Sequence, residues 1–121
     1  MAGRKQGQGS KWIRPAKRLA IYHRDGFCCA YCARGVEDGI ILTLDHVTAC
    51  ELGGTNEPTN LVTACLSCNS AKQDSTLRQF ATWMLDKGID PNVVGKRIRR
   101  QTSRTLDLAA GKALLASRAA S

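Results

Sequence analysis

Four of the six cysteines form two Cys-x2-Cys pairs, Cys29/Cys32 and Cys65/Cys68, separated by 32 residues. Each pair is expected to present two thiolates from a tight turn, and two facing pairs make the tetrahedral four-sulfur site that zinc prefers. Such a site has no open coordination position, so the ion would be structural and its binding energy would be folding energy. Disulfides or a redox-active pair fit less well, because two separate pairs occur without a secretion signal.

Two cysteines remain outside these pairs. Cys28-x3-Cys32 is also a permitted ligand spacing, so Cys28 is an alternative to Cys29, which we prefer as the ligand. For Cys28 and Cys50 the default expectation is a buried free thiol.

A second group of polar side chains lies between and beside the cysteine pairs. Asp45 and Asn69 offer oxygen atoms, which are hard ligands suited to Mg²⁺ or Mn²⁺, and such ions take few protein ligands and leave room for water and substrate phosphate. His46 follows Asp45 and would point to the opposite face of a strand, where a neutral imidazole is a suitable general base. Each residue alone is more often a cap, turn or core residue, but their combination between two cysteine pairs favours a catalytic site.

The segments RDGFCCAYC and LTLDHVTACELGGTNEPTNLVTACLSCNSAK, within residues 24–72, resemble an HNH endonuclease of the ββα-metal type with a four-cysteine zinc site. The resemblance covers about two-fifths of the chain. It implies an α+β fold in which a small ββα-metal core, stapled by the zinc site, is joined by flanking helices. It also implies a metal-dependent endonuclease that hydrolyses DNA phosphodiester bonds.

The resemblance assigns a role to each polar residue of the motif. His46 would be the general base, Asp45 would bind the catalytic metal, and Asn60 would restrain the loop and help to orient the base. Asn69 stands where the family has His or Asn and would be the second metal ligand. One divalent ion would bind the scissile phosphate and the leaving 3′-oxygen while His46 activates water, which gives 5′-phosphate and 3′-hydroxyl ends.

The net charge of +8 is unevenly distributed along the chain. Residues 1–24 hold seven Lys or Arg and no acid, residues 95–121 hold seven and one acid, and residues 25–94 are net acidic. Basic flanks suggest that the protein binds a nucleic acid through salt-sensitive contacts to its phosphate backbone, with weak sequence preference. The alternative is that the basic tails only keep a small protein in solution. The residues expected to contact nucleic acid are Lys72, Arg24, Arg97 and Arg100; for Arg24 the alternative is a brace for the zinc turn.

Local signals place these residues on elements. A helix is expected from about Arg14 to Gly26, strands over residues 40–48 and 61–64, and a long turn-rich loop over residues 50–60. Helices are expected after Cys68, over residues 75–87 and from Asp90-Pro91, while the tail from residue 106 is helical or frayed.

We expect three parts: a flexible basic arm at residues 1–12, the nuclease domain at 13–88 and a basic helical extension at 89–121. No apolar run is long enough for a membrane span, and no signal peptide is recognised, so a cytoplasmic protein, monomeric or weakly dimeric, is expected. The alternative functions are a zinc-stapled DNA-binding module, or an accessory subunit of a larger DNA-processing complex. Small free-standing HNH proteins resemble phage DNA-packaging nucleases, which work with terminase.

Overall fold

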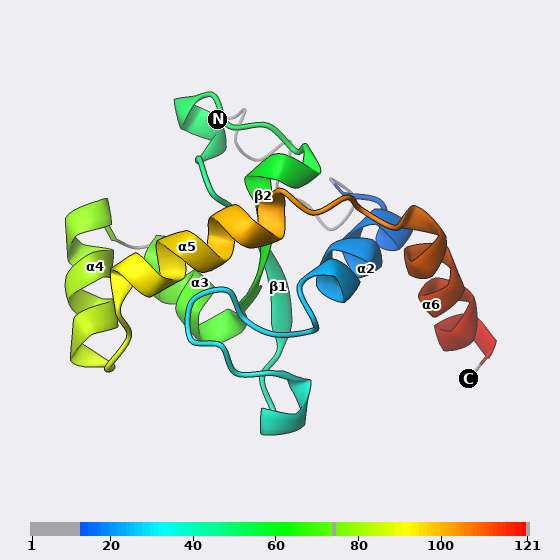
Figure 1. Ribbon diagram of the computed structural model, residues 1–121, viewed down its shortest axis with the longest axis horizontal. Helices are drawn as coiled ribbons and strands as arrows, with labels where there is room; N and C mark the ends of the chain where they lie inside the picture. Colours follow the sequence, from blue (N-terminus) through cyan, green and yellow to red (C-terminus); the bar gives the residue numbers. More distant parts are fainter. Residues whose placement is uncertain (1–12, 74, 121) are drawn as a thin grey trace.

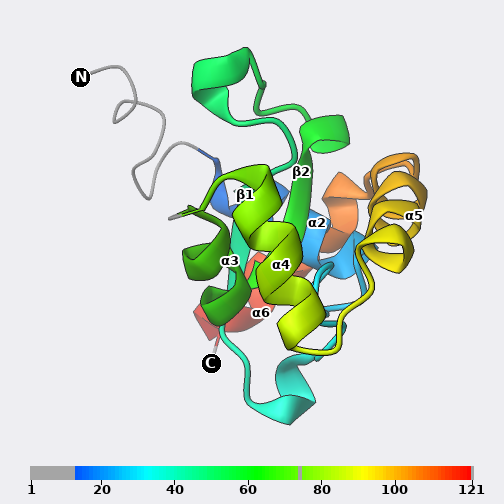
Figure 2. The same cartoon turned by 90° about the vertical axis from the view of Figure 1, so that its left-hand side faces the viewer.

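The computed structural model describes residues 13–73 and 75–120, in which five α-helices surround a two-stranded antiparallel sheet (Figures 1 and 2). This confirms the expected α+β class. The basic arm expected over residues 1–12 lies outside the described residues. None of the helices in the described part of the chain has the length and apolar character needed to cross a lipid bilayer.

The sheet consists of β1 (Leu42–His46) and β2 (Leu61–Cys65). The strands pair so that His46 lies opposite Leu61, and every residue of β2 is buried. Side chains alternate along β1, so Thr43 and Asp45 lie on the sheet face that contacts the helix after β2, and His46 lies on the other face. Both strands were predicted, and β1 is shorter than the predicted 40–48.

The chain passes directly from β2 into α3 (Leu66–Gln73). The predicted helix through Asn69 and Lys72 is confirmed, but it begins before Cys68, so the expectation of a tight turn around the second cysteine pair is wrong. Cys68 lies in the first turn of the helix, where its backbone N–H points at Cys65 Sγ at 3.4 Å. The amides at a helix start have no intrahelical partner, so they are available to a sulfur at the end of the preceding strand.

Two helices cover the α3 side, α4 (Leu77–Asp86) and α5 (Pro91–Thr102). Both occur close to the predicted positions, α4 from apolar periodicity and α5 from the cap and proline at Asp90-Pro91. The Thr76 hydroxyl accepts from the Gln79 amide at 3.1 Å, and the Asp90 carboxylate accepts from the Asn92 amide at 2.9 Å. Such caps satisfy amide groups that the helix itself leaves unpaired.

The tail is helical. It forms α6 (Leu108–Ala120), which lies beside α2 (Pro15–Arg24), so segments from opposite ends of the described chain are neighbours (Figure 1). The helices approach closely because Gly111 has no side chain: a Cβ there would lie 2.0 Å from the Ala16 carbonyl oxygen. Only glycine permits this contact.

The core has two parts, one on each side of the sheet. The first surrounds the cysteine cluster; it includes Cys29, Ala30, Tyr31, Val62, Ala64, Phe80, Met84 and Val94. The second lies under α2 and includes Ile13, Leu19, Ile21, Tyr22, Leu44 and Leu61. Both cores are small and poor in aromatic residues, which leaves room for a metal ion to contribute to folding.

Candidate active site

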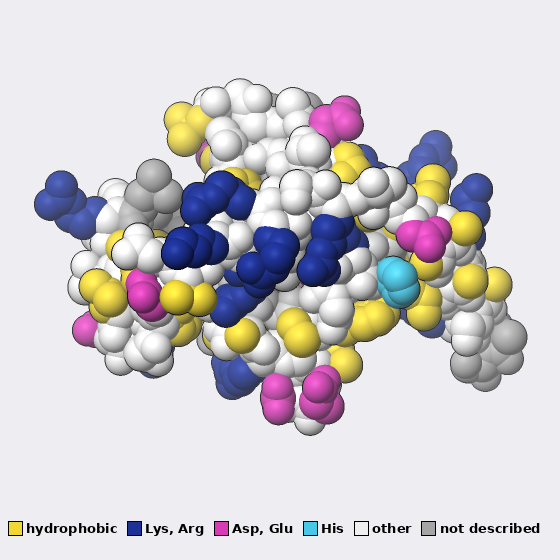
Figure 3. Space-filling model, in the orientation of Figure 1, with side chains coloured by type: hydrophobic (Ala, Val, Ile, Leu, Met, Phe, Trp, Pro, Cys, Tyr) yellow, Lys and Arg dark blue, Asp and Glu magenta, His cyan; other side chains and the backbone are white. Residues whose placement is uncertain are grey.

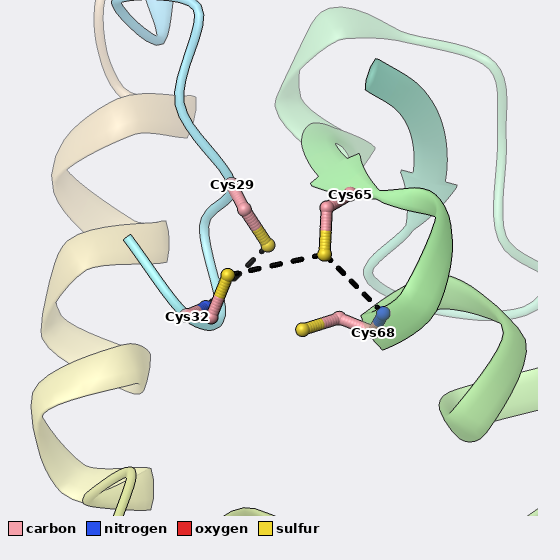
Figure 4. A group of neighbouring side chains, drawn as sticks. All are labelled: Cys29, Cys32, Cys65 and Cys68. Atoms are coloured by element: carbon pink, nitrogen blue, oxygen red, sulfur yellow. Dashed lines mark hydrogen bonds between the residues drawn. The ribbon is translucent and has the colours of Figure 1, made fainter. Parts of the chain in front are cut away.

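The structure brings Cys29, Cys32, Cys65 and Cys68 together (Figure 4). Their sulfur atoms all lie within 4.8 Å of one another, and Cys32 Sγ is 3.8 Å from Cys65 Sγ. Tetrahedral zinc with bonds of about 2.3 Å separates its sulfur ligands by roughly 3.8 Å, so this donor set fits a single ion. Cys28 lies outside the cluster, and its thiol donates to a backbone carbonyl at 3.2 Å.

The electrostatics of the cluster show why a cation belongs there. A hydrogen bond from Cys68 lowers the pKa of Cys29 to about 5, and backbone amides add to this effect. The same contact raises the pKa of Cys68, and burial raises the pKa of Cys65. One thiolate is thus stabilised at the expense of its neighbours, whereas a bound cation allows all the sulfurs to ionise.

Asp45 and His46 end β1 at the wall of a cleft of about 930 Å³. Cys50, Lys72 and Phe80 also line this cleft. Asp45 and His46 are mostly buried, at 7% and 8% exposure, so the strand holds both side chains in defined positions.

The Asp45 carboxylate is anchored through Oδ2. The Tyr31 hydroxyl donates to this oxygen, and Lys72 Nζ lies 2.9 Å from it. Lys72 also donates to the His46 carbonyl oxygen at 3.0 Å. Burial, followed by the charge of Asp45, raises the pKa of Tyr31, so its hydroxyl remains a donor.

Asn69 projects from α3 toward β1. Its Nδ2 donates to Thr43 Oγ1 at 2.9 Å and to the Leu44 carbonyl at 3.1 Å. Since that carbonyl only accepts, the amide orientation is determined. The buried Oδ1 has no hydrogen-bond partner among the described residues, a costly arrangement unless it binds something else. Together with the Asp45 carboxylate, it provides hard oxygen donors that fit Mg²⁺ or Mn²⁺.

The His46 ring faces the loop after β1. Its Nε2 lies 2.7 Å from Asn56 Oδ1 and 3.4 Å from Cys50 Sγ. An amide oxygen only accepts, so this contact favours the tautomer with the proton on Nε2 and a lone pair on Nδ1.

Asn60 closes the base of this loop. Its Nδ2 donates to the carbonyls of Thr48 and Thr55 at 3.0 and 2.8 Å, and its Oδ1 accepts from the Thr48 amide at 2.8 Å. Gly54 packs on the same backbone, where a Cβ would lie 1.8 Å from the Thr48 carbonyl oxygen. Asn60 therefore acts on the shape of the loop, whereas Asn56 and Cys50 are loop residues that contact the His46 ring directly.

Residues 29–75 match the family model described as HNH endonuclease. Over these residues the chain is similar to an HNH endonuclease domain. No curated protein and no solved structure matches it. The match begins at the first ligand cysteine and extends just beyond α3, so it spans the cysteine cluster, β1, the loop and β2. An HNH domain indicates nuclease activity on nucleic acid, and its cysteine cluster can hold a metal ion.

The residues expected to contact nucleic acid lie in different settings. Arg24 is buried: Nε donates to Asp25 at 2.8 Å, and Nη2 donates to the Leu61 carbonyl at 2.7 Å. Its guanidinium is thus used inside the protein, which argues against the expected phosphate contact. Its partners are Asp25 and the Pro58 and Leu61 carbonyls rather than the cysteine turn, so the alternative role as a brace for the zinc turn stays a prediction. Arg97 is half-buried and donates to the Ala30 carbonyl at 2.6 Å.

Exposed basic side chains gather on α5. Figure 3 shows Lys and Arg side chains across the middle of the face on which this helix lies. The exposed ones in and after the helix are Lys96, Arg99, Arg100 and Arg104. The segment from residue 91 to 106 contains no acid. This surface therefore suits a polyanion.

Sequence reasoning missed Tyr31 and Asn56. Tyr31 lies between two ligand cysteines, a position that hinted at proximity to the metal cluster but not at a contact with Asp45. Asn56 lies in a loop dense in turn-forming residues, where nothing in its spacing distinguishes it. The contacts join residues 14 and 10 positions apart, separations that no local pattern links.

Proposed function

We propose that the HNH domain hydrolyses DNA phosphodiester bonds with a divalent cation and with His46 as general base. The observation that carries this is the buried, unpartnered Oδ1 of Asn69, beside a strand that ends in Asp45 and His46. An oxygen donor without a protein partner, on an amide whose nitrogen contacts the strand that bears Asp45, suits a hard cation.

A divalent cation held by Asp45 and Asn69 would stabilise the charge that develops on the scissile phosphate and on the leaving 3′-oxygen. Asn56 holds His46 with the proton on Nε2, and Nδ1 accepts a proton from water as the water attacks phosphorus in line. The bond to the 3′-oxygen breaks, and this oxygen takes a proton from solvent water, which leaves a 5′-phosphate and a 3′-hydroxyl. Asn60 keeps the loop, and hence Asn56, in place.

The four-cysteine cluster would hold structural zinc, since a complete thiolate shell leaves no position for substrate. Arg97, Arg100 and Lys72 are the proposed DNA contacts. Arg100 and its exposed neighbours on α5 would bind phosphates without reading bases, so we propose weak sequence preference and nicking by a single site.

Plasmid cleavage by the zinc-loaded protein tests this function. We expect nicking with Mg²⁺ or Mn²⁺, none with EDTA, and a loss of about 10²- to 10⁴-fold in His46→Ala. His23→Ala is the matched control, because His23 is exposed on α2 and remote in sequence from the site. A folded, zinc-loaded wild-type protein that binds DNA but never cleaves it would overturn the proposal and favour a binding module or an accessory subunit.

A further inference from the structure

Tyr31 connects the two candidate metal sites. Its backbone belongs to the turn between Cys29 and Cys32, and its amide points at Cys29 Sγ at 3.3 Å. Its side chain crosses the first core and reaches Asp45 on β1. A change in the shape of the cysteine turn would therefore move the group that donates to Asp45.

The ring of Tyr31 is held firmly. It is 4% exposed and packs edge-to-face on Phe80, with ring centroids 5.2 Å apart, and Phe80 stacks on Trp83 at 5.6 Å. Aromatic packing of this kind fixes ring orientation, so the direction of the hydroxyl follows from the backbone position.

The contact is made to one carboxylate oxygen. Among the described residues, Tyr31 and Lys72 both approach Oδ2 of Asp45. This arrangement orients the carboxylate and directs Oδ1 as the oxygen available to a cation. A neutral donor such as the Tyr31 hydroxyl, which holds the carboxylate from behind, sets its geometry and its affinity for metal, whereas the Lys72 ammonium adds a charge that opposes a cation.

We infer that Tyr31 is a positioning residue through which the four-thiolate site controls the affinity of Asp45 for the catalytic divalent cation. The inference rests on the proposed function only in placing that cation at Asp45 and Asn69. An ion in the cysteine cluster fixes the turn, the turn fixes Tyr31, and Tyr31 orients Asp45. The tight binding of one metal thus prepares the site of the other.

The test is Mn²⁺ binding to the zinc-loaded, full-length protein, measured by the loss of the free Mn²⁺ electron paramagnetic resonance signal. Tyr31→Phe keeps the ring and removes only the hydroxyl, and we expect it to bind Mn²⁺ about tenfold more weakly while retaining its zinc. Tyr22→Phe is the matched control, since this buried tyrosine donates instead to the Leu42 carbonyl at 3.2 Å. Wild-type Mn²⁺ affinity in Tyr31→Phe would overturn the inference even if the protein cleaves DNA.

Two further measurements distinguish a positioning effect of Tyr31 on Asp45 from a general loss of folded structure in the variant. In an Asp45→Asn background, Tyr31→Phe should cause no additional loss of Mn²⁺ affinity, because its effect passes through the carboxylate. The wild-type protein supplies a second measurement without any variant. The Tyr31 hydroxyl proton, assigned from its proximity to the ring protons, should shift in the NMR spectrum when Mg²⁺ is added. A full additional loss in the double variant, or an unmoved signal at saturating Mg²⁺, would contradict the inference.

Discussion

The amide oxygen of Asn56 lies 2.7 Å from Nε2 of His46, and the sulfur of Cys50 lies 3.4 Å from the same nitrogen. A Cys-His-Asn nucleophile arrangement needs the cysteine and the asparagine on opposite ring nitrogens. The geometry around His46 therefore argues against thiol catalysis. It is consistent instead with a histidine whose Nδ1 is the basic atom.

Replacing Asn56 should slow cleavage without weakening DNA binding. In Asn56→Ala the ring loses the acceptor that selects its tautomer, and we expect a fall of about 10- to 100-fold in the single-turnover rate, less than in His46→Ala. Asn56→Asp keeps an acceptor oxygen and should recover most of the rate. Asn92→Ala, on the exposed start of α5, is the control. Equal rates for Asn56→Ala and wild type would exclude this role.

Lys72 and a divalent cation should compete for Asp45. The ammonium lies 2.9 Å from Oδ2, and its charge opposes the approach of a second cation. We expect Lys72→Met to bind Mn²⁺ several-fold more tightly in a calorimetric titration, yet to cleave DNA more slowly because a phosphate contact is lost. Lys87→Met, next to Trp83, serves as the control. Weaker Mn²⁺ binding in Lys72→Met would instead mean that Lys72 holds the carboxylate in place.

Removing metal from the cysteine cluster should unfold the HNH domain. Structural zinc contributes about 10–16 kcal/mol in small peptides, more than most domains have in reserve. A strong chelator should therefore abolish most of the helical far-UV signal, and added zinc should restore it. A spectrum that did not change after complete zinc removal, verified by elemental analysis, would refute the structural role.

Zinc affinity should increase with pH. The raised pKa values of Cys65 and Cys68 keep these thiols protonated near neutral pH in the metal-free protein, and both must lose a proton to bind zinc. Zinc binding is thus favoured as the pH rises toward those pKa values and is lost as the pH falls. Calorimetry in buffers of different ionisation enthalpy should detect protons released on binding. Binding without proton release would show that the thiols were already ionised.

Replacing Arg24 should lower the stability of the fold, whereas replacing Arg100 should weaken DNA binding. The side chains of Arg24 and Asp25 are 2% and 0% exposed, so Arg24→Ala leaves a buried carboxylate unpaired and should lower the free energy of unfolding by about 3–5 kcal/mol. Arg100→Ala, on an exposed helix face, should change it by less than about 0.5 kcal/mol but weaken DNA binding at low salt. Urea unfolding and DNA titrations measure both. Unchanged urea stability of Arg24→Ala, with weakened DNA binding, would restore Arg24 as a phosphate contact.

The cysteine cluster and the strand carrying Asp45 and His46 were predictable because ligand type, spacing and alternation are local properties of the sequence. The apolar spacing of residues 75–87 and the cap at Asp90 also located their helices well. The role of Arg24 was not predictable in the same way, since its guanidinium is satisfied partly by carbonyls more than 30 positions along the chain. Tyr31 and Asn56 are comparable cases, in which the partner is brought into contact only by the tertiary fold.

The glycine-mediated contact between α2 and α6 affects the order in which the helices can pack during synthesis. A ribosome produces α2 before any element of the two candidate metal sites and α6 after all of them, so the face of α2 that α6 covers remains open during most of synthesis. The contact joins the first and the last helix of the described chain, and closing so long a loop is slow. Zinc captured early by the two cysteine pairs would shorten that loop, and the ion would then act as a folding nucleus before α6 completes the domain.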